Sequence, residues 1–342
     1  MNPGLEIRTD YPLLTLNTFG INAVASRFVS LASSDDFKKL IESGLLRREP
    51  FFVLGGGSNV VFCGDYKGVI VHPVNKGIRL LSKSTGCVYV EAEAGEVWSD
   101  FVDYCIDNQW FGLENLAGIP GCVGASPVQN VGAYGKEAKD FIDRVHLFDI
   151  QTGVQLWMDA SQCGFGYRWS VFKGEMKNRF LIDKVVFRLS TEFCPDLQYK
   201  ALSSALSERG IDSPTARQLA DTVKQVRDSK LPDPKKIGSA GSFFKNPVVS
   251  RAKAESLLED NPDMVVFPVG DAECKLAAGW LIEQCGWKGR TIGNVGVYEK
   301  QALVLVNRGG CSGAEVKALS DAIINDVESR YGVRLECEAI FV

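Results

Sequence analysis

Histidine is scarce in this chain, which has 342 residues but only two histidines, His72 and His146. So few histidines argue against a histidine-rich metal site and against a serine–histidine relay. The chain also has no excess of charge of one sign, since 38 Lys and Arg residues stand against 42 Asp and Glu residues, for a net charge of −4. We therefore expect neither a bound metal ion nor a dedicated nucleic-acid surface.

Paired cysteine spacings are missing as well. The ten cysteines are scattered from Cys63 to Cys337 without a CxxC pair, which predicts buried thiols in a reducing compartment and no disulfide framework. The N-terminus has neither the basic region nor the apolar run of a signal peptide, and no apolar stretch approaches 18 residues. We expect a cytoplasmic protein without membrane insertion.

Length and composition favour a soluble globular protein of two or three domains. In the first 190 residues, apolar periodicity and glycine turns predict strands separated by single helices, hence an α+β or α/β lobe. The expected elements are helices at 34–43 and 97–110, strands at 51–54, 60–62, 68–71, 87–92 and 180–189, and a hairpin over 143–158. Later the pattern predicts helices at 199–209, 213–230, 251–259, 275–285 and 312–330, and strands at 264–269, 302–306 and 333–341. Ser213 is the expected N-cap of the second of these helices, with Pro214 in its first turn.

A glycine turn, GGGSN at 55–59, directly follows an apolar strand. Its backbone N–H groups have few side chains in the way, which suits phosphate oxygens. A tight turn between two strands explains the same residues equally well. The turn is not a Rossmann fingerprint, because Val60 occupies the position of the last glycine, and the chain has no P-loop.

A longer glycine-rich segment runs from Gly118 to Gly135 with little periodicity. Glycines suit a regular element poorly, because each loses much entropy on ordering. They fit a place where backbone approaches a flat ligand such as an isoalloxazine ring. A flexible surface loop is the alternative, which the interleaved Ile119, Val123 and Val128 make less fitting.

Three further positions carry possible chemistry. Arg168 lies among aromatic residues in FGYRWSVFK at 165–173, where an apolar wall would strengthen its action on a developing anion. A stacked structural arginine is the commoner case. Ser242 lies between Gly241 and two phenylalanines, where a turn or cap hydroxyl is the simpler explanation. Glu336 and Glu338 would share one strand face, which is usually just a solvated face.

In combination, these motifs resemble the UDP-N-acetylenolpyruvoylglucosamine reductases, the MurB family of flavoenzymes of bacterial peptidoglycan synthesis. The resemblance runs from LNTFG at 16–20 to the final strand and includes VLGGGSN at 53–59 and KLAAGWLI at 275–282. Tyr199 and the helices that lead to KLPDP at 230–234 are similar to the segment of the longer, type I form. The implied fold class is α+β: a two-lobed FAD-binding unit of the vanillyl-alcohol-oxidase (PCMH) type, followed by an α/β substrate-binding domain.

The resemblance also implies domain borders. The first FAD-binding lobe would comprise residues 1–75, completed by the C-terminal strand. The second lobe would comprise residues 76–226, with the helical segment 193–226, and the substrate-binding domain residues 227–342.

The implied activity is that of an oxidoreductase with non-covalent FAD, NADPH as hydride donor and UDP-N-acetylglucosamine enolpyruvate as acceptor. Hydride addition to the enolpyruvyl β-carbon develops enolate charge, which Arg168 would stabilise with help from a protonated Glu338. Ser242 matches the general acid of the family, with Lys230 and Asn246 as candidate polar neighbours. We expect a monomer that acts on small molecules.

Ligand contacts follow from the resemblance residue by residue. Those assigned to the flavin are Leu54, Gly55, Gly56, Gly57, Ser58, Asn59, Gly118, Ile119, Pro120, Gly121, Gly124, Ala125, Ser126, Gln129, Asn130, Gly132, Ala133 and Tyr134. Those assigned to the substrate are Tyr167, Tyr199, Lys230, Asn246, Phe267 and Gln301. Phe267 departs from the family pattern, because the best-known long members carry a tyrosine there whose hydroxyl contacts substrate. Cys122 and Ser126 replace commoner small residues beside the flavin.

Two other functions remain open. The chain could be another FAD oxidoreductase of the same fold, such as an aldonolactone or alcohol oxidase, but those often carry a flavin-linking histidine, and neither histidine here lies in a glycine-rich segment. It could also be a non-catalytic UDP-sugar or flavin sensor. A sensor would be expected to lack one of Arg168, Ser242 and Glu338, and all three are present.

Overall fold

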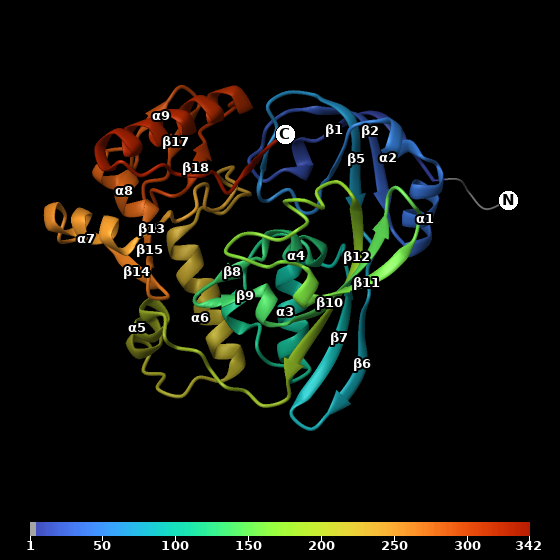
Figure 1. Cartoon of the computed structure of the whole chain (residues 1–342), viewed down its shortest axis with the longest axis horizontal. Helices are drawn as coiled ribbons and strands as arrows, with labels where there is room; N and C mark the ends of the chain where they lie inside the picture. Colours follow the sequence, from blue (N-terminus) through green and yellow to red (C-terminus); the bar gives the residue numbers. More distant parts are fainter. Residues whose placement is uncertain (1–4) are drawn as a thin grey trace. The chain divides into compact units, whose positions relative to one another are not determined.

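Residues 5–342 are described by the computed structural model, and their internal contacts divide the chain into two units (Figure 1). The first unit contains the residues up to Tyr11, Ala25–Gly56 and Tyr66–Asp228. The second contains Pro12–Val24, Gly57–Asp65 and Ser229–Val342. The two lobes and the third domain expected from the sequence, with borders after residues 75 and 226, stay a prediction.

The first unit is built on two larger sheets and one two-stranded antiparallel pair, Gly132–Ala133 with Lys136–Glu137. Its elements are β1 (Arg8–Pro12), β2 (Val24–Leu31), α1 (Ser34–Glu42), α2 (Leu45–Arg48), β3 (Phe51–Val53), β5 (Tyr66–Pro73), β6 (Ile78–Ser84), β7 (Cys87–Glu93), α3 (Trp98–Asp107), α4 (Ser126–Gln129), β8 (Gly132–Ala133), β9 (Lys136–Glu137), β10 (Ile142–Asp149), β11 (Gln155–Asp159), β12 (Phe180–Ser190), α5 (Lys200–Glu208) and α6 (Ala216–Lys230). Single turns of 3₁₀ helix cover Glu114–Leu116, Val123–Ala125, Ala138–Asp140 and Ala160–Gln162 in this unit, and Leu14–Leu16 in the second unit.

The smaller sheet has the strand order β1-β2-β5-β3, and β5 pairs in parallel with both β2 and β3. Val69, Ile70 and Val71 of β5 are fully buried, as expected for a parallel strand covered on both faces. Helix α1 begins with a capping box at Ser33 and buries Phe37, Leu40 and Ile41 against this sheet. The short strand β3 therefore ends at a fixed place, directly before the GGGSN turn.

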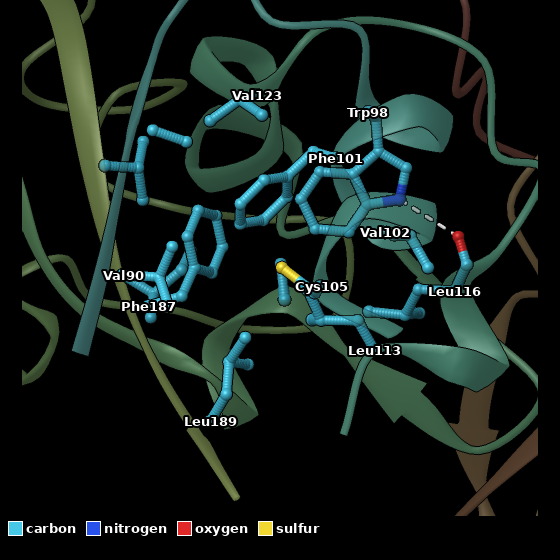
Figure 2. Packing of buried hydrophobic residues seen from close by; sticks show 14 of the residues in the cluster. Val90, Trp98, Phe101, Val102, Cys105, Leu113, Leu116, Val123, Phe187 and Leu189 are labelled. Carbon is cyan, nitrogen blue, oxygen red and sulfur yellow. Dashed lines mark hydrogen bonds between the residues drawn. The ribbon is translucent and has the colours of Figure 1, made fainter. Parts of the chain in front are cut away.

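The larger sheet is antiparallel, with the order β11-β10-β12-β7-β6. The expected hairpin is confirmed, since β10 and β11 pair with Leu147 opposite Leu156. One face of this sheet packs against α3 (Figure 2). The Phe101 and Phe187 rings lie 4.8 Å apart, and Trp98 Nε1 donates a 2.9 Å hydrogen bond to the Leu116 carbonyl. That bond ties the entrance of the Gly118–Gly135 segment to the core.

Helix α6 begins later than the sequence predicts. Thr215 and not Ser213 forms the cap, because its hydroxyl accepts from the Gln218 N–H at 3.2 Å while the Gln218 side chain accepts from the Thr215 N–H at 2.9 Å. Pro214 thus precedes the cap instead of lying in the first turn. The helix buries Leu219 and Val223 in the same core cluster as Leu202 and Leu206 of α5.

The second unit contains small sheets and three longer helices. Its elements are β4 (Val60–Val61), β13 (Val248–Ser250), α7 (Arg251–Asp260), β14 (Val266–Val269), β15 (Glu273–Leu276), α8 (Ala278–Gln284), β16 (Thr291–Ile292), β17 (Val295–Val297), β18 (Leu305–Asn307), α9 (Gly313–Tyr331) and β19 (Ile340–Phe341). The strands form two antiparallel sheets, β13-β15-β14 and β16-β17-β18, and a parallel pair of β4 with β19.

Three sequence predictions in this unit are wrong in extent. The helix expected over 275–285 begins at Ala278, because Glu273–Leu276 pairs as a strand with both β13 and β14. The strand expected over 302–306 is Leu305–Asn307. The strand expected over 333–341 is regular only at Ile340–Phe341, which pairs with β4. Tertiary pairing overrides local periodicity in each case.

The cysteines form no disulfide in the described part of the chain. Cys105, Cys163, Cys274 and Cys311 are buried, as expected, but Cys63 and Cys194 are exposed, so the prediction of buried thiols is wrong for these two. Burial raises the pKa of the Cys163 thiol to about 12. Among residues 5–342, none of the helices combines the length and apolar character that a membrane span requires.

Candidate functional site

Two glycine-rich loops that are far apart in sequence meet in the first unit. A Cβ on Gly56 would lie 3.0 Å from the Gly121 Cα, and one on Gly55 would lie 3.7 Å from the Cys122 side chain. Gly118 and Gly121 have φ values of +68° and +121°, which favour glycine. The result is a cradle of backbone with few Cβ atoms, and such a surface fits a planar ring bound through amide groups.

Leu54 anchors one of these loops. Its side chain is 1% exposed, and its N–H donates to the Val71 carbonyl of β5 at 2.8 Å. The other loop is attached to the end of β7 by the Gly124 N–H, which donates to the Ala94 carbonyl at 2.9 Å. A Cβ on Gly124 would lie only 2.6 Å from the Ala94 Cβ, so packing alone requires glycine there. The predicted flavin contacts at these positions stay predictions.

Asn130 connects the glycine-rich segment to its neighbours. It is fully buried with φ +45°, and its Nδ2 donates to Glu137 at 3.1 Å and to the Gly166 carbonyl at 2.8 Å. Its Oδ1 accepts from the Lys139 N–H at 3.0 Å. Because three segments converge on one side chain, Asn130 fixes the loop beside the turn that carries Arg168.

Arg168 lies against this segment. Its backbone has φ +54°, and its guanidinium donates to the Gly132 carbonyl and lies 5.2 Å from the Tyr167 ring centre. A Cβ on Gly132 would lie 2.8 Å from Arg168 Nη1, so glycine leaves room for the cation. The structure therefore brings Arg168 to Gly132, and the sequence analysis selected these two residues from separate motifs. The left-handed backbone of a non-glycine residue is strained and is typical of functional positions.

Other residues of this unit that were predicted to contact the flavin interact with protein groups in the structure. The Ser126 hydroxyl donates to the Val123 carbonyl at 2.7 Å, and Gln129 Oε1 accepts from Lys173 Nζ at 2.9 Å. Tyr134 has φ +48°, and its ring meets the Tyr199 ring edge to face with centres 5.2 Å apart. Tyr199 itself is 40% exposed and hence available to a ligand.

Sequence reasoning missed Arg227 of α6. Its Nε donates to the Gly118 carbonyl at 3.1 Å, and burial lowers the pKa of its guanidinium. An arginine keeps its charge at neutral pH despite such a shift, so Arg227 brings a second cation to the glycine-rich segment. Its position three residues before Lys230 on the same helix was the one available sequence signal.

The last three residues of the GGGSN turn, 57–59, belong to the second unit and contact other segments of that unit. The Thr18 N–H donates to the Gly57 carbonyl at 3.0 Å, and a Cβ on Gly57 would lie 1.9 Å from the Leu16 carbonyl oxygen. Asn59 Nδ2 donates to the Glu338 carbonyl at 3.1 Å, and the Ile340 N–H donates to the Asn59 carbonyl at 2.9 Å. Gly57, Ser58 and Asn59 are thus fixed beside the C-terminal segment.

Ser242 and Glu338 lie on neighbouring segments of this unit. The Glu338 N–H donates to the Phe243 carbonyl at 2.8 Å, and Phe244 forms an antiparallel bridge with Cys337. Phe243 and Phe244 are buried, which anchors the segment that carries the exposed Ser242, and Glu338 is half-buried on the segment paired with it. The structure thus pairs the segments that carry two of the three predicted catalytic residues.

The same pairing separates the two glutamates that periodicity could not distinguish. Glu336 is exposed and forms a 2.8 Å ion pair with Lys245. Glu338 is half-buried on the segment beside Ser242. An exposed pair contributes little to stability, so Glu336 has the character of a solvated surface residue.

The predicted substrate contacts of the second unit differ in their surroundings. Asn246 Oδ1 accepts from the Ala278 N–H at 3.0 Å, and Gln301 Oε1 accepts from the Leu303 N–H at 3.3 Å. Lys230 is exposed at the end of α6. Phe267 is 40% exposed on β14, directly opposite Lys275 of β15. An exposed ring with a neighbouring cation suits an anionic ligand with a flat base.

Two cavities of the first unit lie elsewhere. One of about 580 Å³ lies between the end of α3 and the start of α6, and one of about 420 Å³ lies beside Arg188. None of the predicted site residues lines either of them. Among residues 5–342, no group of three or more His, Cys, Asp and Glu side chains is arranged to hold a metal ion.

Comparison with known proteins gives two family matches. Residues 25–159 match the model described as FAD binding domain, and residues 233–342 match the model described as UDP-N-acetylenolpyruvoylglucosamine reductase, C-terminal domain. A UDP-N-acetylenolpyruvoylglucosamine reductase of Neisseria gonorrhoeae is 47% identical over 335 residues, covering 98% of this chain and 96% of that protein. One of Azoarcus sp. is 47% identical over 344 residues, covering 99% of both.

A solved structure is similar across nearly the whole chain. It is the UDP-N-acetylenolpyruvylglucosamine reductase (MurB) from Thermus caldophilus, which is 20% identical and gives a TM-score of 0.65 with 98% of both chains covered. At this identity the match concerns the fold. It confirms, together with the FAD binding domain, the fold class expected from the sequence.

Proposed function

The chain belongs to the UDP-N-acetylenolpyruvoylglucosamine reductase family, and from this membership we propose that it reduces UDP-N-acetylglucosamine enolpyruvate to UDP-N-acetylmuramate with electrons from NADPH. Family, FAD cofactor and oxidoreductase class agree with the sequence predictions. The structural observation that supports the proposal is the backbone pairing of the two segments that carry Ser242 and Glu338.

The backbone loops at 55–59 and 118–134 are the proposed holders of FAD. Their glycines leave room for a ring system, and their amides can donate to its polar edge. The bound FAD would supply the hydride chemistry, from NADPH to the enolpyruvyl β-carbon.

The charge that develops on the enolpyruvyl carboxylate needs a fixed cation. Arg168 is the proposed cation, because its guanidinium is fixed by the Gly132 carbonyl, by the Tyr167 ring and by a 4.0 Å ion pair with Glu137. Glu338, in its protonated form, would donate a hydrogen bond to the same developing charge.

The enolate carbon must then receive a proton. Ser242 is the proposed donor, because its hydroxyl is exposed on a segment that the buried Phe243 and Phe244 hold in place. With a hydride on the β-carbon and a proton on the α-carbon, the double bond is reduced and the lactyl ether is complete.

Recognition of the sugar nucleotide is proposed for the remaining residues. Lys230 would bind the diphosphate as a point charge, with Gln301 as a second contact. Tyr167, Tyr199, Asn246 and Phe267 would line the substrate, with Phe267 stacking where it has no hydroxyl to donate.

Replacement of Ser242 by Ala tests the proposed proton donor. We expect flavin reduction by NADPH to proceed nearly as in the wild type, while reoxidation by the enolpyruvyl sugar slows at least about 100-fold, the usual contribution of a general acid. Stopped-flow absorbance of the flavin separates the two half-reactions. Ser250→Ala is the matched control, since that exposed serine of the same unit only caps α7. Equal slowing of both half-reactions in Ser242→Ala would exclude Ser242 as the proton donor.

A further inference from the structure

Asn115 joins two segments that carry proposed ligand contacts. It lies in the 3₁₀ turn Glu114–Leu116, directly before the glycine-rich segment, and is 2% exposed. Its Nδ2 donates to the Tyr134 carbonyl at 2.9 Å and to the Asp196 carbonyl at 3.1 Å. Both amide hydrogens are therefore committed, one to the β8–β9 hairpin and one to the chain that leads into α5.

Further contacts hold these two segments together. Lys136 Nζ of β9 forms a 2.8 Å ion pair with Asp196, whose other carboxylate oxygen accepts from the Gln198 N–H at 3.1 Å. Earlier in the same segment, the Phe193 ring packs against the Phe111 ring, with ring centres 5.5 Å apart. The chain from residue 193 to residue 198 is thus fixed at three successive points.

The consequence concerns Tyr199, the next residue. It is the N-cap of α5 without a side-chain cap hydrogen bond, so the first turn of the helix does not hold its ring. Its one described aromatic contact is with Tyr134, edge to face at 5.2 Å. Tyr134 in turn has the strained φ of +48°, which persists only where its surroundings impose it, and Asn115 binds its carbonyl.

We propose that Asn115 is a positioning residue for the sugar-nucleotide substrate, because it fixes Tyr134 and the approach to Tyr199 through one side chain. The inference rests on the proposed function in one respect, namely that Tyr199 contacts the substrate. If Asn115 only stabilised the core, its replacement would have the same effect with or without the Tyr199 ring. A positioning role acts through that ring and disappears when the ring is removed.

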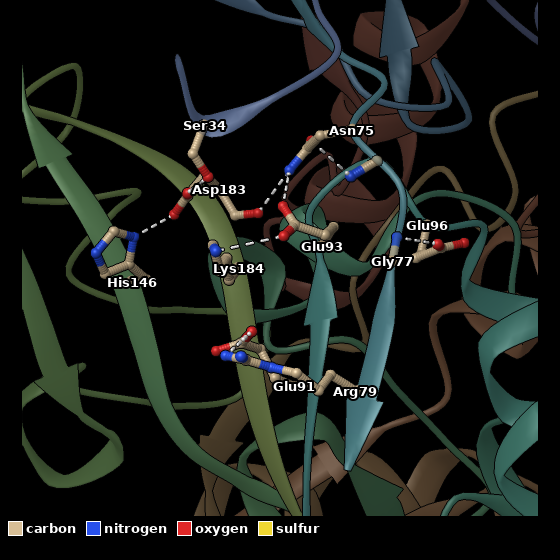
Figure 3. A network of polar contacts seen from close by, with 11 residues as sticks. Ser34, Asn75, Gly77, Arg79, Glu91, Glu93, Glu96, His146, Asp183 and Lys184 are labelled. Carbon is tan, nitrogen blue, oxygen red and sulfur yellow. Dashed lines mark hydrogen bonds and ion pairs between the residues drawn. The ribbon is translucent and has the colours of Figure 1, made fainter. Parts of the chain in front are cut away.

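The matched control is Asn75, another buried asparagine of the first unit. It is 1% exposed, and its Nδ2 also donates to two acceptors, Glu93 and the Asp183 carbonyl at 2.8 Å (Figure 3). It belongs to a polar network around β7 and β12 that contains none of the proposed ligand contacts. Asn75 Oδ1 also accepts from the Gly95 N–H at 3.2 Å. Asn75→Ala therefore removes these three hydrogen bonds and Asn115→Ala removes two, and only the second variant affects the path to Tyr199.

The kinetic test is a double-mutant cycle on the FAD-loaded enzyme. We expect Asn115→Ala to raise the KM for the enolpyruvyl sugar about tenfold, the upper range for one ordered aromatic contact, with kcat within a factor of about 3. Asn75→Ala should leave that KM unchanged. In a Tyr199→Ala background, Asn115→Ala should add no further increase. An equal increase in both backgrounds, or in both asparagine variants, would overturn the proposal.

Hydrogen–deuterium exchange gives a readout that needs no turnover. Asn115→Ala should speed exchange of the amides in 196–204, whereas Asn75→Ala should not. If the wild type fails to reduce the enolpyruvyl sugar but this local increase occurs, Asn115 still positions the segment that carries Tyr199, and it is the proposed substrate that is wrong. If 196–204 exchanges as in the wild type, Asn115 does not position Tyr199, whatever the activity.

Discussion

Replacing Gly57 by Ala should disrupt the turn that we propose holds FAD. The added Cβ would lie 1.9 Å from the Leu16 carbonyl oxygen and 2.8 Å from its carbon, and Gly57 has φ +62°. Neither neighbour is the end of a flexible side chain, so the backbone itself must move. The Thr18 N–H would then lose its 3.0 Å bond to the Gly57 carbonyl.

The size of this effect follows from two contributions. A left-handed alanine costs about 1–2 kcal/mol relative to glycine, and the lost hydrogen bond about another 1 kcal/mol. We therefore expect the free energy of unfolding to fall by about 2–3 kcal/mol, before any cost of the steric overlap. Gly270→Ala is the matched control in the same unit, with φ +58° and no atom within 4 Å of the added Cβ. It should lose only the contribution of about 1–2 kcal/mol from the left-handed backbone.

Two assays check the expectation. Denaturant unfolding gives the free energy difference between the variants, and the ratio of flavin to protein absorbance after desalting gives the FAD that each retains. Gly57→Ala should be the less stable variant and should lose FAD, whereas Gly270→Ala should keep it. If both variants lose the same stability and retain FAD equally, the close approach at Gly57 has no role in the flavin site.

Three further outcomes are expected. Glu338→Ala should lower kcat, because alanine cannot donate the proposed hydrogen bond to the developing charge, while Glu336→Ala should leave kcat and KM unchanged in a steady-state assay because its exposed carboxylate pairs with Lys245. Equal effects would mean that the two glutamates are misassigned. The hydrogen bond from Lys136 lowers the pKa of Asp196, so the stabilisation by this pair is present at neutral pH and is lost as the pH falls through that lowered pKa, below about 3.9. Lys136→Met should accordingly be less stable than the wild type at pH 7, and the difference should vanish in acid; a difference independent of pH would contradict this. Burial raises the pKa of the Cys163 thiol to about 12, so an aromatic disulfide reagent at pH 8 should label the exposed thiols of the folded protein and leave Cys163 unlabelled. Labelling of Cys163 at the rate of the exposed thiols would refute its burial.

Local signals in the sequence predicted most of the regular elements. The 143–158 hairpin and helix α1 were identified because alternation, glycine turns and a serine cap act over a few residues. The extents that were wrong depend on partners far along the chain. Glu273–Leu276 is a strand because β13 and β14 pair with it, and only the last two residues of the expected C-terminal strand find β4.

The site shows the same division. Arg168, Ser242 and the glycine-rich loops were selected by motif. In the structure the two loops contact each other at Gly56 and Gly121, and Arg168 binds the Gly132 carbonyl. The hydrogen bonds of Asn115, Asn130 and Arg227 were not predictable, because each binds backbone carbonyls of segments that local periodicity cannot relate to it. The choice between Glu336 and Glu338 likewise required the pairing with 243–245.

The visible spectrum of the purified protein tests the central claim most directly. Under anaerobic conditions, the flavin band should bleach on addition of NADPH and return on addition of UDP-N-acetylglucosamine enolpyruvate. Recovery with that substrate would establish both half-reactions and the ligand pair. A band that bleaches but returns only with oxygen or another acceptor would contradict the proposed reaction.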